Sequence, residues 1–251
     1  MTSSPGIAAR LRSACDDYGT IDAALLVLQR LVRRVSPPAV IERLHIVAQP
    51  VPRTRDGNGR RGQAIQVRPL GPGDPALATF SRIPAEVTDR FAQGAVCLGA
   101  FRGAELLGWL WFTVGAFRDH THPVAVELAP AAATAWDFDV YVRPEARFTA
   151  AFARLWEAAF DALRERGVSQ TLSAISAYNP ASLRAHRRLG TAPFGSLLVL
   201  RLGRLQAVLS RQFEPHWQVS LQPDFLATFR VTAPALPAES TLNKSPARSS
   251  S

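Results

Sequence analysis

Apolar residues recur at two different spacings along the chain, and the changes of spacing predict a series of helices and strands. Over residues 21–35 they recur every three or four positions, which is the period of an amphipathic helix, and the other face of this helix is rich in arginine. Pro37 and Pro38 end the helix. Further strands are predicted at 44–48, 64–70, 96–101, 105–114, 135–142, 171–176 and 194–202, and further helices at 86–93, 147–166 and 180–189.

These elements divide the chain into four zones. Residues 1–63 form an N-terminal extension with the basic amphipathic helix and one short strand. Residues 64–204 alternate strands and helices, which predicts an α/β domain. Residues 205–233 keep an apolar alternation and are expected to pair as strands onto that domain. Residues 234–251 are rich in proline, serine and alanine, so we expect a disordered tail.

The charge and composition of the chain limit the classes of partner that we expect it to bind. The net charge of +9 comes almost entirely from arginine, and Lys244 is the only lysine. Such a charge favours cofactor phosphates, nucleic acid or an acidic membrane, unless the arginines are simply spread over the surface. No nucleic-acid-binding motif accompanies it, so no specific nucleic acid is expected. Without a membrane-spanning run or a signal sequence, the expected compartment is the cytoplasm.

Three motif-like patterns are weak. The glycines in 57–62 spell G-x-G-x-x-G but precede a strand, whereas a dinucleotide loop opens a helix, so a loop is the better interpretation. His120 and His122 stand beside Asp119 without further clustered ligands, which favours an exposed loop over a metal site, and no metal is expected. Cys97 lies in an apolar run and reads as a buried, inert thiol.

Two segments contain the residues expected to take part in binding or catalysis. In the first, residues 137–147, a strand runs directly into a tight turn and a helix, where main-chain amides and Arg147 can bind phosphate. In the second, residues 179–190, a short helix follows the next strand.

Together the two segments resemble the motifs of the GNAT acetyltransferases. The turn motif is matched by Val142, Pro144, Glu145 and Arg147, and the later motif by Asn179, Ser182, Leu189 and Gly190. The resemblance, that of a divergent bacterial member, covers residues 64–204 and implies an α/β (α+β) fold with a mixed, mostly antiparallel central sheet flanked by helices. It also implies acetyl-CoA as the acyl donor. The residues it implies for CoA binding are Val140, Tyr141, Val142, Arg147, Phe148, Thr149, Ala150, Ala151, Asn179 and Ser182.

The chain departs from the family pattern at chemically meaningful positions. Ala150 and Phe152 stand where glycines let the backbone approach a pyrophosphate, and Phe148 adds bulk. His186 stands where a tyrosine commonly protonates the departing thiolate, and an imidazolium can also donate a proton.

Two carboxylates complete the candidate site. Strict alternation along 136–142 places Asp137 and Asp139 on one face of a central strand, which is costly unless they have partners or serve a site. As catalytic groups they would hold a cationic amine or accept its proton. As structural groups they would pair with an arginine such as Arg143 or Arg184.

The favoured hypothesis is transfer of an acyl group, expected to be acetyl, from CoA to a small-molecule amine. Its proposed catalytic residues are Asp139, His186 and Asp137. The main alternative is a non-catalytic GNAT-fold module that binds a ligand or partner. Residues 21–35 could also contact an anionic membrane or a protein, although packing on the core is the simpler interpretation. The acceptor and the oligomeric state stay open.

Overall fold

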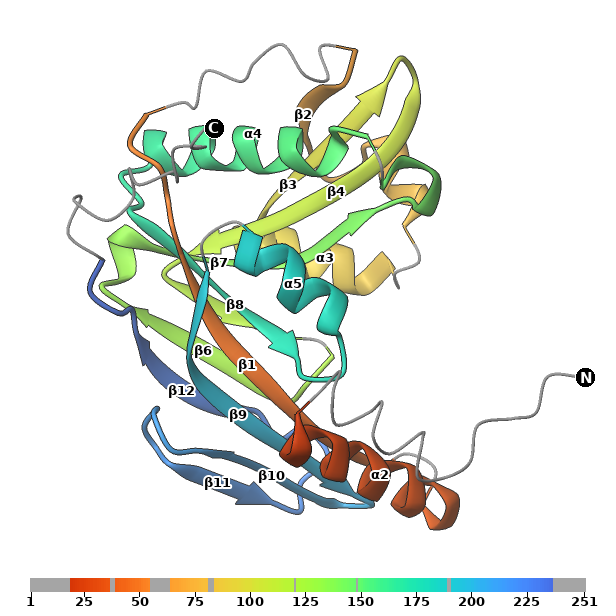
Figure 1. Cartoon of the computed structure of the whole chain (residues 1–251), viewed down its shortest axis with the longest axis vertical. Coiled ribbons are helices and arrows are strands. Elements are labelled where there is room, and N and C mark those ends of the chain that lie inside the picture. Colours follow the sequence, from red (N-terminus) through yellow and green to blue (C-terminus); the bar gives the residue numbers. More distant parts are fainter. Residues whose placement is uncertain are drawn as a thin grey trace, which may run out of the picture.

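The protein is described here from a computed structural model, which covers residues 19–36, 39–54, 64–80, 84–119, 121–147, 149–188 and 191–236. Its main element is a nine-stranded sheet with the order β11-β10-β9-β1-β8-β7-β4-β3-β2 (Figure 1). The strands of this sheet are β1 (Val40–Pro50), β2 (Gln66–Leu70), β3 (Val96–Arg102), β4 (Glu105–Val114), β7 (Thr134–Val142), β8 (Gln170–Ser176), β9 (Ala192–Leu202), β10 (Leu205–Ser210) and β11 (Trp217–Ser220).

A second, three-stranded sheet has the order β12-β6-β5. Its strands are β5 (Ala116–Arg118), β6 (Val124–Ala129) and β12 (Ala227–Thr232). The helices are α2 (Thr20–Val35), α3 (Pro84–Ala92), α4 (Ala151–Glu165) and α5 (Pro180–Arg188), with 3₁₀ turns η1 (Pro75–Thr79), η2 (Ala131–Ala133) and η3 (Pro144–Ala146). No described helix is long and apolar enough to cross a membrane.

The elements predicted from the apolar spacing are present, and the mostly antiparallel GNAT-like α/β fold is confirmed. The boundaries that differ most are the starts of two elements: β1 begins at Val40 rather than at residue 44, and α4 begins at Ala151 rather than at residue 147, after η3 and the turn that follows it. Gly167, just after α4, has φ 73°, a conformation that favours glycine at the end of a helix.

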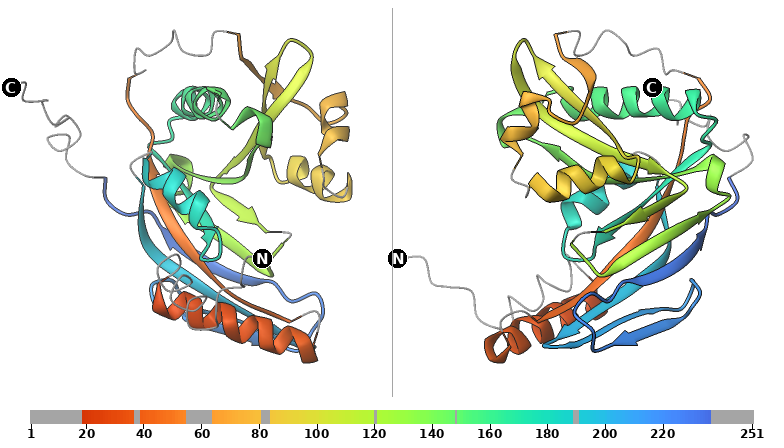
Figure 2. Two further views of the ribbon diagram at one scale, coloured as in Figure 1. Left: turned by 45° about the vertical axis from the view of Figure 1, so that its right-hand side comes forward. Right: turned by 180° about the vertical axis from the view of Figure 1, so that it is seen from behind.

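The two faces of the large sheet are covered differently. On one face, α4 packs its apolar stripe over β2, β3 and β4, and α5 lies over β7 and β8 (Figure 1). On the opposite face, α3 packs on β3 and β4, and the three-stranded sheet covers β1, β9 and β10. Figure 2 shows α3 and α4 on opposite sides of the sheet.

Strand β1 sits in the middle of the sheet although it comes from the N-terminal zone. It pairs antiparallel with β8 on one side and with β9 on the other. The C-terminal zone supplies β10 and β11 to the same sheet and β12 to the smaller one. The proposed domain boundaries stay a prediction, and the tail from residue 237 lies outside the described residues.

Strands β7 and β8 separate soon after they meet. Their parallel pairing covers only Thr134–Trp136 against Gln170–Leu172, although β7 continues to Val142 and β8 to Ser176. Figure 1 shows α5 lying over the point where the two strands diverge. This divergence positions the candidate site, because side chains from β7, β8, α4 and α5 meet there.

Candidate active site

A bulge in β7 separates the two aspartates. Trp111 pairs with Phe138 and Trp109 pairs with Tyr141, so two residues of β7, Asp139 and Val140, oppose one residue of β4. Asp139 has φ 49°, and it is the one described residue other than glycine with a positive φ. The prediction that strict alternation places Asp137 and Asp139 on one face is therefore wrong: the extra residue reverses the alternation between them.

Asp137 faces α5 and meets His186. His186 Nε2 lies 3.9 Å from Asp137 Oδ1, which is an ion-pair distance and too long for a hydrogen bond. The Thr171 hydroxyl donates to Asp137 Oδ2 at 2.8 Å. Asp137 is 2% exposed and His186 5%, so the two predicted groups form a buried pair where β7 and β8 diverge.

The imidazole of His186 is held on its other side as well. His186 Nδ1 lies 2.9 Å from the Ser182 carbonyl, one turn earlier in α5, and can donate to it. The ring also meets the indole of Trp156 edge-on, with 6.1 Å between the ring centres. Burial acts to lower the pKa of His186, but the Asp137 carboxylate and the Ser182 carbonyl outweigh it and raise the pKa above its usual value. The protonated form is favoured.

Asp139 points to the opposite face, toward α3. Arg90 Nη1 donates to Asp139 Oδ2 at 2.5 Å, and both side chains are largely buried. The guanidinium of Arg90 also lies over two rings, 5.3 Å from Trp111 and 5.2 Å from Phe138. Asp139 therefore has an arginine partner, as one of the two interpretations expects, and that partner is Arg90. The suggested partner Arg143 bonds to Glu105 instead.

The turn before α4, the predicted phosphate site, contains no glycine. Ala150, the residue before the helix, has φ −77°, so its backbone needs no glycine. No acidic side chain lies in the first turn of α4, and the alanine at the N-cap, Ala150, makes no side-chain cap bond of its own. The Thr149 hydroxyl accepts from the amide of Ala151 at 3.2 Å, while Arg147 is exposed at the turn.

The other predicted CoA-binding residues divide between the two faces. Val140 and Val142 pack toward α4, whereas Tyr141 stacks on Trp109 on the α3 side at 4.4 Å. Asn179 Oδ1 accepts from the amide of Ser182 at 3.1 Å and so caps α5. Phe148 lies outside the described residues, as do residues 189–190.

The structure describes only some residues of the three weak motifs, and their surroundings differ. The glycine triplet and His120 lie outside the described residues. His122 is not an exposed loop residue: Nδ1 lies 3.0 Å from Asp119 Oδ2, and Nε2 lies 3.3 Å from Glu42 Oε2. Burial acts against its charge, but the two carboxylates raise the pKa of His122 to about 9. Cys97 is fully buried, and burial raises the pKa of its thiol.

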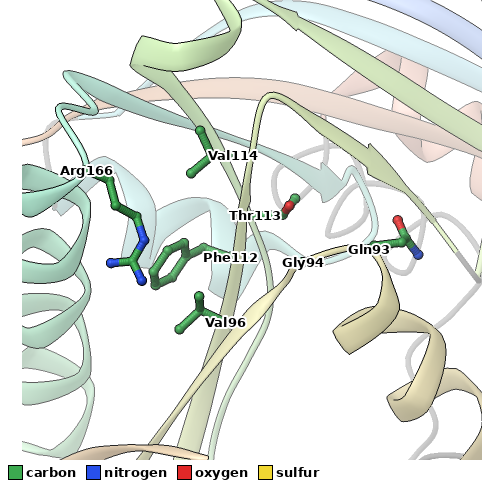
Figure 3. A pocket seen from close by; sticks show the side chains of 7 residues that line it. All are labelled: Gln93, Gly94, Val96, Phe112, Thr113, Val114 and Arg166. Atoms are coloured by element: carbon green, nitrogen blue, oxygen red, sulfur yellow. The ribbon is translucent and has the colours of Figure 1, made fainter. Parts of the chain in front are cut away.

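A pocket of about 360 Å³ lies elsewhere, between the end of α3, the β3–β4 pair and the end of α4. Figure 3 shows the Arg166 side chain next to the Phe112 ring, with Val96 and Val114 beside them. This pocket shares no lining residue with the predicted site, so it contributes nothing to the proposed chemistry.

Sequence reasoning missed Arg90, Thr171 and Trp156 as members of the site. Arg90 left a signal, because Val87, Arg90 and Phe91 share one face of α3, and a charge on an apolar face indicates a buried partner. Trp156 lies among the apolar core residues of α4, and no local pattern separates it from them.

The splayed parallel pair and the strand–turn–helix unit define a GNAT-like α/β fold. Residues 72–191, a little under half of the chain, match the acetyltransferase (GNAT) family. Members of this family use acetyl-CoA as the donor of the acyl group.

Solved structures similar to the chain have low sequence identity. A functionally unknown conserved protein from Staphylococcus epidermidis is 12% identical, with a TM-score of 0.41 over 68% of this chain and 64% of its own length. An aminoglycoside acetyltransferase from an uncultured soil metagenomic sample is 13% identical, with a TM-score of 0.38 over 50% of this chain and 86% of its own. A putative GNAT acetyltransferase from Novosphingobium aromaticivorans is 16% identical, with a TM-score of 0.39 over 64% and 65%. No curated protein matches the chain.

Proposed function

We propose that this protein transfers an acetyl group from acetyl-CoA to the amine of a small molecule. The observation that carries the proposal is the buried Asp137–His186 pair where β7 and β8 diverge, since β7 is also the strand that leads into the turn before α4. Phosphates of the donor would bind at that turn, held by main-chain amides of α4 and by Arg147.

The reaction needs one proton removed and one supplied. The neutral amine attacks the thioester carbonyl carbon, a carbon–nitrogen bond forms, the carbon–sulfur bond breaks, and the thiolate leaves. Main-chain N–H groups near Val140 and Val142 would stabilise the developing oxyanion. His186 would give its Nε2 proton to the thiolate. The 3.9 Å separation from Asp137 supports this role, because the N–H is not committed to a hydrogen bond there.

Asp139 would act on the acceptor side of β7. Its carboxylate is held by Arg90, and it would receive the amine proton through a water molecule. Tyr141, which is 36% exposed and stacked on Trp109, offers the acceptor an aromatic surface beside that carboxylate. These groups favour a cationic amine with an apolar portion.

Calorimetry with acetyl-CoA tests the proposal. The parent protein should bind, and Arg147→Ala should weaken binding by about 1–3 kcal/mol, the usual contribution of a hydrogen bond to a charged group. Arg143→Ala is the matched control, since Arg143 is an exposed residue next to the same turn but bonds to Glu105 and should leave binding unchanged. No heat with acetyl-CoA, CoA or longer acyl-CoAs would contradict the proposal. Binding without thiol release in a panel of amines would favour the non-catalytic alternative.

A further inference from the structure

One side-chain hydrogen bond joins β7 and β8 at the point where their main-chain pairing ends. The Thr171 hydroxyl of β8 donates to Asp137 Oδ2 of β7 at 2.8 Å. The last paired residues of the two strands are Trp136 and Leu172, so Asp137 is the first residue of β7 beyond the pairing. The bond therefore spans the strands where they begin to diverge, and it fixes the Asp137 side chain there.

The Thr171 hydroxyl has no competing acceptor among the described residues. Its neighbour across the sheet is Gln49 of β1, and the buried amide of Gln49 makes no hydrogen bond within the described part of the chain. Since an ionised carboxylate only accepts hydrogen bonds, the proton in the contact with Asp137 comes from Thr171. One described donor thus holds one oxygen of a carboxylate that is 2% exposed.

The Thr171 bond leaves the other oxygen of Asp137 facing His186. With Oδ2 bound to Thr171, Oδ1 lies 3.9 Å from His186 Nε2, which allows an ion pair but is too long for a hydrogen bond. The Ser182 carbonyl lies 2.9 Å from Nδ1 and favours a proton on that nitrogen. Nε2 is therefore the nitrogen of the imidazole that gains and loses a proton.

The imidazole has one charged neighbour among the described groups, the Asp137 carboxylate. Helix α4 presents the uncharged indole of Trp156 to the ring, and the nearby arginines of α5, Arg184 and Arg187, are exposed. The distance between Asp137 and His186 therefore controls how strongly the Nε2 proton is held.

We propose that Thr171 is a positioning residue of the reaction: its hydroxyl holds the Asp137 carboxylate short of a direct hydrogen bond with His186, so that the Nε2 proton stays available to the departing thiolate. When the carbon–sulfur bond breaks, sulfur keeps the electron pair and takes this proton, which leaves a neutral imidazole beside a carboxylate that stays charged. No hydrogen bond between Asp137 and His186 has to break in this step. The role in turnover rests on the proposed function, whereas the restraint on Asp137 is a property of the free protein.

Removal of the hydroxyl should close the gap between the two groups. In Thr171→Val the side chain keeps its shape but loses its proton donor, and His186 is then the remaining described partner of the buried carboxylate. A buried carboxylate is stabilised by a hydrogen bond, so Asp137 should turn toward Nε2 and accept from it. This bond favours the imidazolium and must break before the proton can leave. Thr171→Val should therefore raise the pKa of His186 and slow turnover.

NMR titration of the histidine side chains in the full chain tests the restraint without any substrate. In Thr171→Val the acid dissociation constant of the His186 imidazolium should fall roughly 10–100-fold, the range expected for one hydrogen bond to a charged group. Thr171→Ser keeps a donor and should bring the constant back toward that of the parent. A Thr171→Val protein whose His186 titrates as in the parent, or at lower pH, would overturn the proposal.

Thr134→Val is the matched control for this titration. Thr134 is also fully buried where β7 pairs with β8, but its hydroxyl has no hydrogen-bond partner among the described residues, so the variant should leave the titration of His186 unchanged. Thermal melting checks that each variant is folded. Thr171→Ala, which removes the same donor, replaces Thr171→Val if that variant is not folded.

Thiol release from acetyl-CoA as a function of pH tests the role of Thr171 in turnover. Thr171→Val should lower kcat roughly 10–100-fold, the effect of one added hydrogen bond to break, without a matching change in KM. The pH above which turnover falls should rise with the pKa of His186, and Thr171→Ser should reverse both effects. A Thr171→Val protein with the raised pKa but the kcat of the parent would overturn the positioning role. A parent that releases no thiol with any amine contradicts the proposed function instead, and the titration still decides the restraint.

Discussion

Asp137 and Asp139 stand two residues apart on β7, yet they face opposite sides of the sheet and have partners of different kinds. Asp137 faces His186, a group that gains and loses a proton near neutral pH, across 3.9 Å. Asp139 faces Arg90, which stays charged at all physiological pH values, across 2.5 Å. The difference teaches that one bulged residue gives β7 two buried carboxylates in different settings, one beside an imidazole and one beside a guanidinium.

The largest expected effect is on the His186 side of β7. His186→Ala should lower turnover roughly 10²–10⁴-fold, the usual contribution of one acid–base group, while acetyl-CoA affinity changes little. His186→Tyr should retain activity and extend it to higher pH, since the reference pKa of tyrosine is about 10. Thiol release as a function of pH measures both variants. An alanine variant that turns over like the parent would make His186 a core residue without a catalytic role.

On the Arg90 side of β7, loss of the buried pair should reduce stability. Arg90→Met leaves the Asp139 carboxylate buried without its arginine and should cost about 3–5 kcal/mol of unfolding free energy in urea. Adding Asp139→Asn removes that charge, so the double variant should be more stable than the sum of the two single changes predicts. Additive effects would show that the two side chains do not interact.

His122, a half-buried histidine, extends the comparison, because it pairs with two carboxylates where His186 pairs with one. Its folded pKa of about 9 lies above the reference 6.5, so its contribution to stability is complete below pH 6.5 and is lost as pH rises through 9. Over this window the parent should lose roughly 2–4 kcal/mol of unfolding free energy relative to His122→Gln. Parallel stability curves for the two proteins between pH 6 and 10 would refute the assignment.

The smallest effect concerns the bulge itself. In the Arg90→Met background, Asp139→Gly should be more stable than Asp139→Ala by about 1 kcal/mol, because φ 49° is strained for a residue with a Cβ. Chemical denaturation of the two proteins gives the difference. Equal stabilities would mean that β7 straightens when the Asp139–Arg90 pair is removed.

Local patterns predicted the elements well and the site only in part. The helical stripe of α4 and the alternation of β4 are local, so their boundaries followed from the sequence to within a few residues. The place of β1 between β8 and β9 depends on pairing with residues more than a hundred positions away, which apolar spacing does not encode. The bulge at Asp139 was not predicted because the pairing of β4 with β7 decides it.

Titration of the histidine side chains by NMR, with and without acetyl-CoA, tests the central claim that the His186 side of β7 holds the reacting thioester. In the free protein, His186 should titrate above the reference pKa of about 6.5, as its pairing with Asp137 requires. Saturating acetyl-CoA should shift the resonances and the pKa of His186, and those of His122, which bonds to Asp119 and Glu42, should stay unchanged. A His186 signal that acetyl-CoA leaves unmoved while the ligand is bound would contradict the account.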